Sequence, residues 1–409
     1  MAKPCVSVCL FVLSLFGSAA LAQNTATVPH QPPAFTSSVF ATMNIQARHE
    51  ASNRMSASAN AMSKNQDPRI VTLPNFSSSF TFGGQTFPFT MVGRDPSRRK
   101  TTVIPTQYIS LSFSFDEFVD ANGNNIVIDN SPIGPILFAS PLFNNFTYQT
   151  GFTQYEDSVM RAEFFPLFNK DGDNDHDDNY HVLLAPPVSL IPVTIEVPVG
   201  SAVAALLPDG TFVAEIDINY ISDQLNTLFQ TEPIDPRAIP IFIGRNVVYG
   251  DFVNQQPVDC CIGGFHSAFV SNQTPEAIFV QTFTFATWLQ PDISEFLFGD
   301  PTIFADIEPI SHEIGETFND PFVNNIVPNY QLPGFPVGTC QNLLEVGDVV
   351  EATPNPSFPI TLNGFTYHPQ TLGLLQWFEG LTPSNAFNGD YSFPGNNLTS
   401  PFQPCPTGP

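Results

Sequence analysis

The 409-residue sequence predicts an α+β fold in which a β-rich N-terminal half is followed by a polar helix in the C-terminal half. Apolar residues alternate with polar ones in short runs between residues 70 and 290, and Gly, Pro, Asn and Asp separate these runs, as is typical of strands and turns. The chain has 40 Phe and 40 Pro but only 12% charged residues, which favours a sizeable core and loops stiffened by proline.

The alternation predicts a mixed β-sheet. The expected strands lie at residues 78–84, 86–93, 107–115, 193–199, 211–220, 260–270 and 277–289. Nothing after residue 70 resembles an interdomain linker, so we expect residues 69–409 to form a single α+β domain.

Two helices are predicted within the β-rich half. Residues 153–165 carry apolar side chains at helical spacing on one side. Residues 222–229 predict a second helix, with Ser222 as its N-cap.

The first 22 residues have the features of a secretory signal peptide. Lys3 is followed by an apolar run at residues 6–16 and by small residues up to Ala22, where we expect cleavage. This run is about half the roughly 20 residues that a membrane-spanning helix needs, and no later run is long enough. We therefore expect a secreted or periplasmic protein without a transmembrane segment after cleavage, in which residues 23–68 form a flexible N-terminal arm.

The charge of the chain limits its partners. With 38 acidic and 13 basic residues, the formal net charge is −25, which disfavours binding to nucleic acid or to anionic lipid.

Four cysteines remain after the signal peptide, which favours two disulfides in an oxidising compartment. Because Cys260 and Cys261 are adjacent and a bond between neighbours is strained, we expect one of them to pair with Cys340 and the other with Cys405.

The segment SHEIGETFNDPF, residues 311–322, predicts a metal-binding helix. It ends near Asp320, because Pro321 disfavours helical geometry in the residue before it. On this helix His312, Glu316 and Asp320 are spaced by four residues, so they share a stripe about 80° wide and all three can face one cation.

The segment differs from the zinc-protease signature H-E-x-x-H in one residue, because Glu316 replaces the second histidine. Glu313 lies about 100° around the helix from His312, where such enzymes place the general base. Gly315 within the helix costs up to about 1 kcal/mol relative to alanine, which suggests close packing of another segment.

A third ligand would come from Asp320, Glu345 or His368. We expect zinc, although a carboxylate-rich set shifts the preference towards Mn, Fe or Ca relative to a site with two histidines. The alternative is an amphipathic helix whose acids face water.

The strands predicted at residues 260–270 and 277–289 precede this helix, an order in which zincin folds place a substrate-binding edge above the metal. His266 lies on the first of them, and we expect it to line the site and contact a peptide or protein substrate.

A separate acidic run at residues 171–179 resembles a calcium loop. Its alternating carboxylates could surround Ca²⁺, but the sixth and twelfth positions do not match an EF-hand, and a solvated acidic loop is the alternative. The possible calcium ligands are Asp171, Asp173, Asp175 and Asp177.

Five segments between residues 260 and 400 resemble a set of uncharacterised exported bacterial proteins. They are CCIGGFHSAF, SHEIGETFNDPF, LLEVGDVV, YHPQTL and YSFPGNNLTSP. The trio GFHS, SHEIGE followed by NDP, and EVGD is also similar to the plant phosphate-induced, exordium-like secreted proteins. The resemblance implies a zincin-like metallopeptidase fold with its metal-site half at about residues 260–400. The residues that match the family pattern are His312, Glu313, Glu316, Asp320, Glu345 and Asp348.

Together these features predict a secreted metal-dependent peptidase in which a metal-activated water attacks a peptide bond, with Glu313 as the base. The alternative is a non-catalytic secreted or envelope-associated binding protein with a structural metal. A serine hydrolase is disfavoured because no G-x-S-x-G segment occurs, whereas glycosidase carboxylates would leave no local signature.

Overall fold

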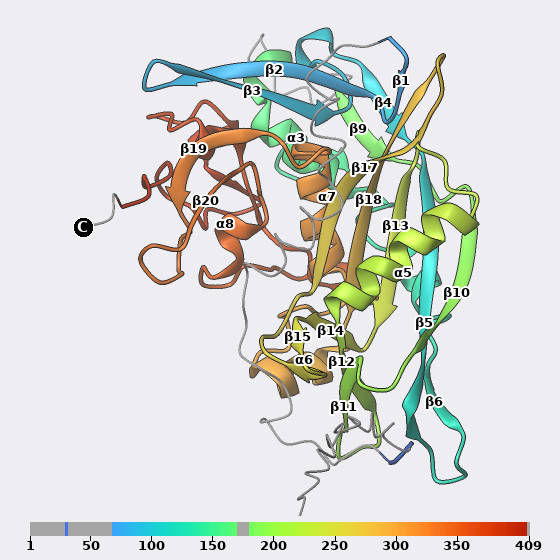
Figure 1. The fold of residues 1–409 in the computed structure, drawn as a ribbon. Helices are drawn as coiled ribbons and strands as arrows, with labels where there is room; N and C mark the ends of the chain where they lie inside the picture. Colours follow the sequence, from blue (N-terminus) through green and yellow to red (C-terminus); the bar gives the residue numbers. More distant parts are fainter. Residues whose placement is uncertain (1–28, 32–67, 170–179, 407–409) are drawn as a thin grey trace, which may run out of the picture.

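A computed structural model describes residues 29–31, 68–169 and 180–406, and Figure 1 shows the path of the chain. The described part is rich in strands and includes a largely parallel sheet with helices packed on it, which confirms the expected mixture of helix and sheet. The predicted signal peptide, nearly all of the predicted N-terminal arm and the calcium candidates Asp171, Asp173, Asp175 and Asp177 lie outside the described residues.

The central sheet has seven strands. Four of them run parallel in the order β18, β13, β5 and β10; the short β1 also pairs in parallel with β18, whereas β17 and β6 pair antiparallel with β18 and β5. Their bounds are β1 Ile70–Val71, β5 Thr106–Val119, β6 Asn125–Ile128, β10 Leu190–Val197, β13 Ile239–Arg245, β17 Gly264–Gln273 and β18 Ile278–Trp288.

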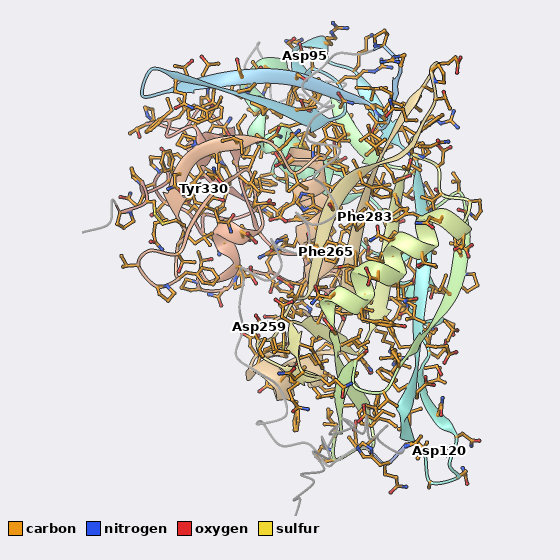
Figure 2. All side chains as sticks on the ribbon, in the orientation of Figure 1. Asp95, Asp120, Asp259, Phe265, Phe283 and Tyr330 are labelled. Carbon is orange, nitrogen blue, oxygen red and sulfur yellow. A yellow bond between two sulfur atoms is a disulfide. The ribbon has the colours of Figure 1, made fainter. Side chains whose placement is uncertain are left out.

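Alternating side chains of the sheet pack into two separate cores. On β13, Phe242 lies in one core, whereas Ile241 and Ile243 lie in the other, because successive side chains of a strand point to opposite faces. The helix α5 (Ile218–Thr231) covers the first face (Figure 1). Phe265 and Phe283 belong to this core, with ring centroids 5.7 Å apart (Figure 2).

The second face is covered by α3 (Tyr155–Glu163) and α7 (Glu308–Asn319). Their apolar residues share one core with side chains from Leu73 to Phe402, so this core joins the sheet to the C-terminal part of the chain. Figure 1 shows α7 between the central sheet and the C-terminal segment, which is drawn in orange to red.

The predicted helices are present with changed boundaries. Residues 153–165 form α3 and the start of α4 (Phe165–Phe168). The second helix is longer than predicted, and its cap is wrong: Asp217, the last residue of β12 (Phe212–Asp217), accepts a hydrogen bond from the backbone N–H of Asn219. Ser222 lies one turn inside the helix because the chain passes directly from strand to helix, and its hydroxyl donates to the carbonyl of Ile218.

The first two predicted strands form a hairpin of β2 (Asn75–Phe82) and β3 (Gln85–Val92). Gly83 and Gly84 form its two-residue turn with φ of 57° and 83°, a conformation that glycine adopts without steric cost. Asn325 anchors β3 near the end of α7, because its amide bonds both the N–H and the carbonyl of Thr90.

Short elements complete the described fold. In the first part of the chain these are η1 Pro96–Arg98, β4 Thr101–Ile104, α2 Ile133–Phe138, β7 Phe146–Tyr148, β8 Gly151–Thr153, β9 His181–Leu184, β11 Ala202–Leu206, β14 Val247–Gly250, β15 Phe252–Val253, β16 Gln256–Pro257 and α6 Pro291–Phe298. After α7 they are β19 Ile326–Gln331, β20 Cys340–Leu343, α8 Asp348–Glu351, β21 Ile360–Leu362, β22 Phe365–Tyr367, β23 Leu372–Gly373, α9 Leu375–Phe378, η2 Phe387–Gly389 and β24 Ser392–Phe393.

The structure contains two disulfides, but the predicted pairing is wrong. Cys260 bonds to its neighbour Cys261, whose Cα atom lies 3.0 Å away, and Cys340 bonds to Cys405 across a Cα separation of 5.9 Å. Cys340 begins β20, and the backbone N–H of Cys405 donates to Asn329 on the partner strand β19, so the fold brings these two cysteines together.

No helix among the described residues is long and apolar enough to cross a membrane. In the described part of the predicted arm, His30 pairs with the end of β5, where its N–H donates to the carbonyl of Glu117.

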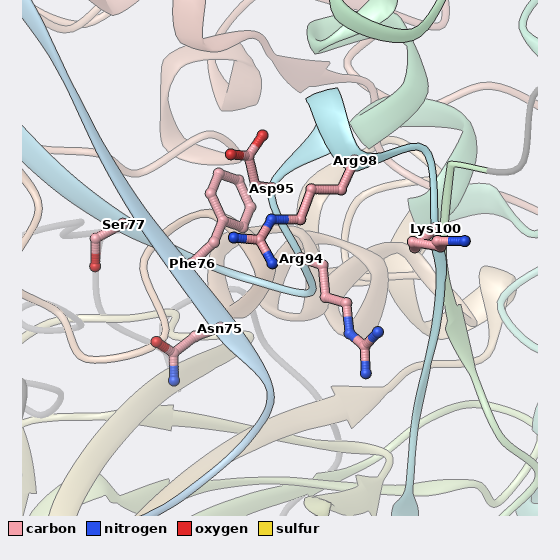
Figure 3. A pocket seen from close by; sticks show the side chains of 7 residues that line it. All are labelled: Asn75, Phe76, Ser77, Arg94, Asp95, Arg98 and Lys100. Carbon is pink, nitrogen blue, oxygen red and sulfur yellow. The ribbon is translucent and has the colours of Figure 1, made fainter. Parts of the chain in front are cut away.

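A cavity of about 700 Å³ near η1 gathers basic side chains (Figure 3). It is lined by Asn75, Phe76, Ser77, Arg94, Asp95, Arg98 and Lys100. Among the described residues that line it, Asp95 is the one carboxylate and accepts hydrogen bonds from the backbone N–H and the hydroxyl of Ser97, and none is a histidine. This described lining does not form a set of metal ligands.

The bond between Cys340 and Cys405 should contribute to stability. It closes a loop with a sequence separation of 65, for which chain entropy predicts about 4 kcal/mol. We expect the double change Cys340→Ser and Cys405→Ser to lower the free energy of unfolding by about this amount in urea denaturation. The matched control is Cys260→Ser with Cys261→Ser, which opens almost no loop. An equal loss in both variants would contradict the prediction.

Glu163 at the end of α3 should make stability depend on pH. Burial raises the pKa of Glu163 from 4.5 to about 8, although its carboxylate accepts a hydrogen bond from the backbone N–H of Leu375. As pH rises from 4.5 to 8, the unfolded chain ionises while the folded one stays protonated, so the free energy of unfolding falls by on the order of 4 kcal/mol.

We expect Glu163→Gln to remove this loss, because the amide oxygen can keep the bond to Leu375 without a charge. The variant should match the wild type at pH 4 and exceed its stability at pH 8 in urea denaturation. Glu295→Gln, at an exposed position of α6, is the control. A constant difference between Glu163→Gln and wild type across this range would contradict the prediction.

Candidate metal centre

The helix α7 is buried along its whole length. It begins at Glu308, three residues earlier than predicted, and ends at Asn319, next to Asp320. Ile310, Ile314 and Phe318 pack into the core, and the polar face is also covered because α7 lies between the sheet and the C-terminal segment. The alternative of an amphipathic helix whose acids face water is therefore wrong.

Gly315 allows the close packing that the sequence suggested. A Cβ atom at this position would lie 2.2 Å from the side chain of Leu372 on β23 and 3.2 Å from a carboxylate oxygen of Glu156 on α3. Two segments distant in sequence thus approach α7 at its glycine.

His312, Glu316 and Asp348 form the first group of donor atoms. Nε2 of His312 lies 3.0 Å from Oε1 of Glu316 and 3.5 Å from Oδ1 of Asp348, and all three residues are buried. Donors bound to one tetrahedral zinc at about 2.0 to 2.1 Å lie roughly 3.3 Å apart. The spacing of this group therefore fits one tetrahedral cation.

The turn at residues 345–348 positions this group. The backbone N–H groups of Gly347 and Asp348 donate to Oε1 of Glu316 at 3.2 and 3.3 Å. A Cβ atom on Gly347 would lie 2.5 Å from the ring of His312, so glycine is needed for the imidazole to rest against this turn. Gln341 donates to Oδ2 of Asp348 at 2.7 Å, which orients the carboxylate as an outer-shell partner does.

His266 on β17 faces the same helix. Together with Glu313 and Glu316 it forms a second group of donor atoms. Its Nδ1 lies 3.5 Å from Oε2 of Glu313 and 3.3 Å from Oε2 of Glu316, and its Nε2 lies 3.9 Å from Oε2 of Glu345. Burial lowers the pKa of His266, but the carboxylates of Glu345, Glu313 and Glu316 together raise it well above its usual value. The second group thus concentrates negative charge around one imidazole.

Glu316 belongs to both groups, since its two oxygens face the two histidines. Its burial is made possible by this environment, because a carboxylate out of contact with water requires hydrogen bonds or cations. The residues of the two groups come from β17, α7 and the turn at residues 345–348, and these three segments adjoin in the fold.

The carboxylate of Asp320 has a different role from the one predicted. It accepts hydrogen bonds from the backbone N–H groups of Asn324 and Asn325, and burial raises its pKa to about 7. These bonds hold the turn that follows α7. Its carboxylate belongs to neither group of donor atoms, and its backbone carbonyl lies 3.2 Å from Nε2 of His266.

His368 lies in neither group of donor atoms. Its Nδ1 is 2.7 Å from Oδ2 of Asp306, and its backbone N–H donates to the other oxygen of that carboxylate. The hydrogen bond to Asp306 raises the pKa of His368. This pair joins the loop before α7 to the end of β22.

Asp348 was not among the ligands chosen from the sequence, although it matched the family pattern. Its signal was the combination of Glu345, Gly347 and Asp348 in one short turn, in which glycine permits close approach of a histidine ring. Glu345, chosen instead, lies beside His266.

Comparisons of the chain with models of protein families, with curated proteins and with solved structures found no match.

The geometry predicts which histidine is needed for metal binding. We expect purified protein to retain at least one equivalent of zinc by elemental analysis, and His312→Ala to lose the ion held with Asp348. His368→Ala is the matched control and should keep the wild-type metal content, because this side chain is bonded to Asp306. If His368→Ala lost zinc while His312→Ala retained it, the assignment would be contradicted.

Proposed function

We propose that this chain is a secreted, zincin-like metal-dependent peptidase whose metal is held by His312, Glu316 and Asp348. The observation that carries the proposal is the convergence of three donor atoms from α7 and a separate turn, next to the buried carboxylate of Glu313. An imidazole and two carboxylates are ligand types that zinc accepts, and three protein ligands leave a coordination position open.

A divalent cation in this group would supply Lewis-acid activation of the water and the scissile carbonyl. Glu313 is the next residue after His312 on α7 and therefore points to the side of the metal group, as a base acting on that water must. We assign it the transfer of a proton from the attacking water to the leaving amine. The carboxylate of Asp348, fixed by Gln341, keeps the metal in place during this transfer.

The layout of the sheet supports a peptide substrate. β17 runs antiparallel to β18, and α7 packs against both, which places His266 of β17 beside Glu313. We assign contact with an extended substrate to this part of β17, because the strand lies beside the candidate base.

Export is part of the proposal. The N-terminal sequence has the features of a signal peptide, and two disulfides in the fold accord with an oxidising compartment.

One observation favours a second candidate, a binding protein with a structural metal. His312, Glu313 and Glu316 are exposed by only 3%, 1% and 2%, and structural zinc sites are closed to solvent. In that case Glu313 has no proton to transfer.

Changing Glu313 to Gln separates these two functions. In the peptidase, the ion held by His312, Glu316 and Asp348 should be retained and the melting temperature should change little, while turnover of a cleaved peptide falls roughly 10²-fold or more, the usual contribution of a general base. Glu295→Gln on the exposed side of α6 controls for the loss of one charge. If metal-loaded wild type cleaves nothing in a broad peptide library, the binding protein is the better description.

A further inference from the structure

The ring of His266 is fixed between a backbone carbonyl and two carboxylates. Nε2 lies 3.2 Å from the carbonyl oxygen of Asp320, and a carbonyl oxygen can only accept, so this nitrogen carries a hydrogen. Nδ1, on the other side of the ring, faces Oε2 of Glu313 and Oε2 of Glu316 at 3.5 and 3.3 Å.

This arrangement calls for a positive charge beside Nδ1. With the hydrogen on Nε2, a lone pair at Nδ1 would repel the two carboxylate oxygens in this buried site, so Nδ1 must face either a second proton or a cation. A divalent cation between the three atoms removes the repulsion and uses all three as ligands. Metal-binding histidines characteristically donate their other N–H to a carbonyl or a carboxylate, as His266 does to Asp320.

We propose that His266, Glu313 and Glu316 bind a second divalent metal ion beside the one held by His312, Glu316 and Asp348. Glu316 would bridge the two ions, because Oε1 faces His312 at 3.0 Å and Oε2 faces His266 at 3.3 Å. Two-metal sites with shared ligands hold their ions roughly 3.5 to 4 Å apart.

The charge of the cluster is consistent with two ions. Glu313, Glu316, Glu345 and Asp348 are all buried, and if all four are ionised, one divalent ion balances only half of their formal charge. Buried charges that lack compensation are strongly destabilising. A second ion completes the balance within the same donor set.

The second ion has a consequence for catalysis that rests on the proposed function. Glu313 is the base in that proposal, and a carboxylate that ligates a metal ion is a weaker base towards the attacking water, because the ion withdraws electron density and occupies one of its oxygens. Occupancy of the second group therefore inhibits hydrolysis. Activity should rise as the first equivalent of zinc binds and fall as the second binds.

The two donor sets should also differ in affinity. The second ion shares Glu316 with the first and is repelled by it, so it binds more weakly at equal ligand number. The first group is in addition preorganised by three hydrogen bonds, from Gly347, Asp348 and Gln341.

The experiment is a titration of metal-free full-length protein with zinc, followed by equilibrium dialysis with elemental analysis and by peptide hydrolysis. We expect two equivalents in wild type and one in His266→Gln, with at least tenfold lower turnover of wild type at the second equivalent than at the first. His266→Asn is a second variant in case Gln disturbs folding, and the melting temperature of each variant checks this. His368→Ala is the matched control and should bind two equivalents.

The outcomes separate the second ion from the proposed function. Suppose that wild type binds one equivalent, which His312→Ala loses and His266→Gln keeps. This result would overturn the second site and leave the first centre in place. His266 would then be an imidazolium. One equivalent that His266→Gln removes and His312→Ala retains would overturn the first centre alone. No zinc in wild type would overturn both, and two equivalents with undiminished turnover would overturn the inhibition.

Discussion

The hydrogen bonds from the turn at residues 345–348 to Glu316 are the interaction on which the candidate centre depends. They join the middle of α7 to a segment about thirty residues later in the chain and bring Asp348 to His312. They also explain why a carboxylate at position 316 is compatible with this site. An oxygen of Glu316 can accept two backbone N–H groups while the other oxygen faces His266, which one imidazole nitrogen could not do.

Local patterns in the sequence predicted several of the elements but not how they meet. Strand alternation predicted the two strands β2 and β3 and the pair β17 and β18, whereas the central strand β13 was not predicted. Helical spacing placed His312 and Glu316 on one face of α7. The same spacing failed for Asp320, because the helix ends before it and the carboxylate turns back to bond the following backbone. Periodicity describes a continuing helix and carries no information on its last turn.

The partners of residues that are distant in the sequence could not be predicted from local patterns either. Asp348 and His368 are equally plausible ligands in the sequence, and only the packing of β22 and the loop before α7 assigns His368 to Asp306. The cysteines show the same limit, since the pairing followed from strand neighbours β19 and β20 and not from the spacing of residues. The alternative of solvent-facing acids in α7 arose because polar composition normally indicates an exposed face, whereas here two layers of the fold enclose the helix.

The two glycines beside the centre carry as much information about it as the charged residues do. Gly315 admits Leu372 behind α7, and Gly347 admits the ring of His312 in front of Asp348, so a methyl group at either place would collide with a fixed neighbour. A search for distant relatives of this chain should weight the two glycines together with the acids. The acids supply candidate ligands, and the glycines leave the room that Leu372 and His312 occupy.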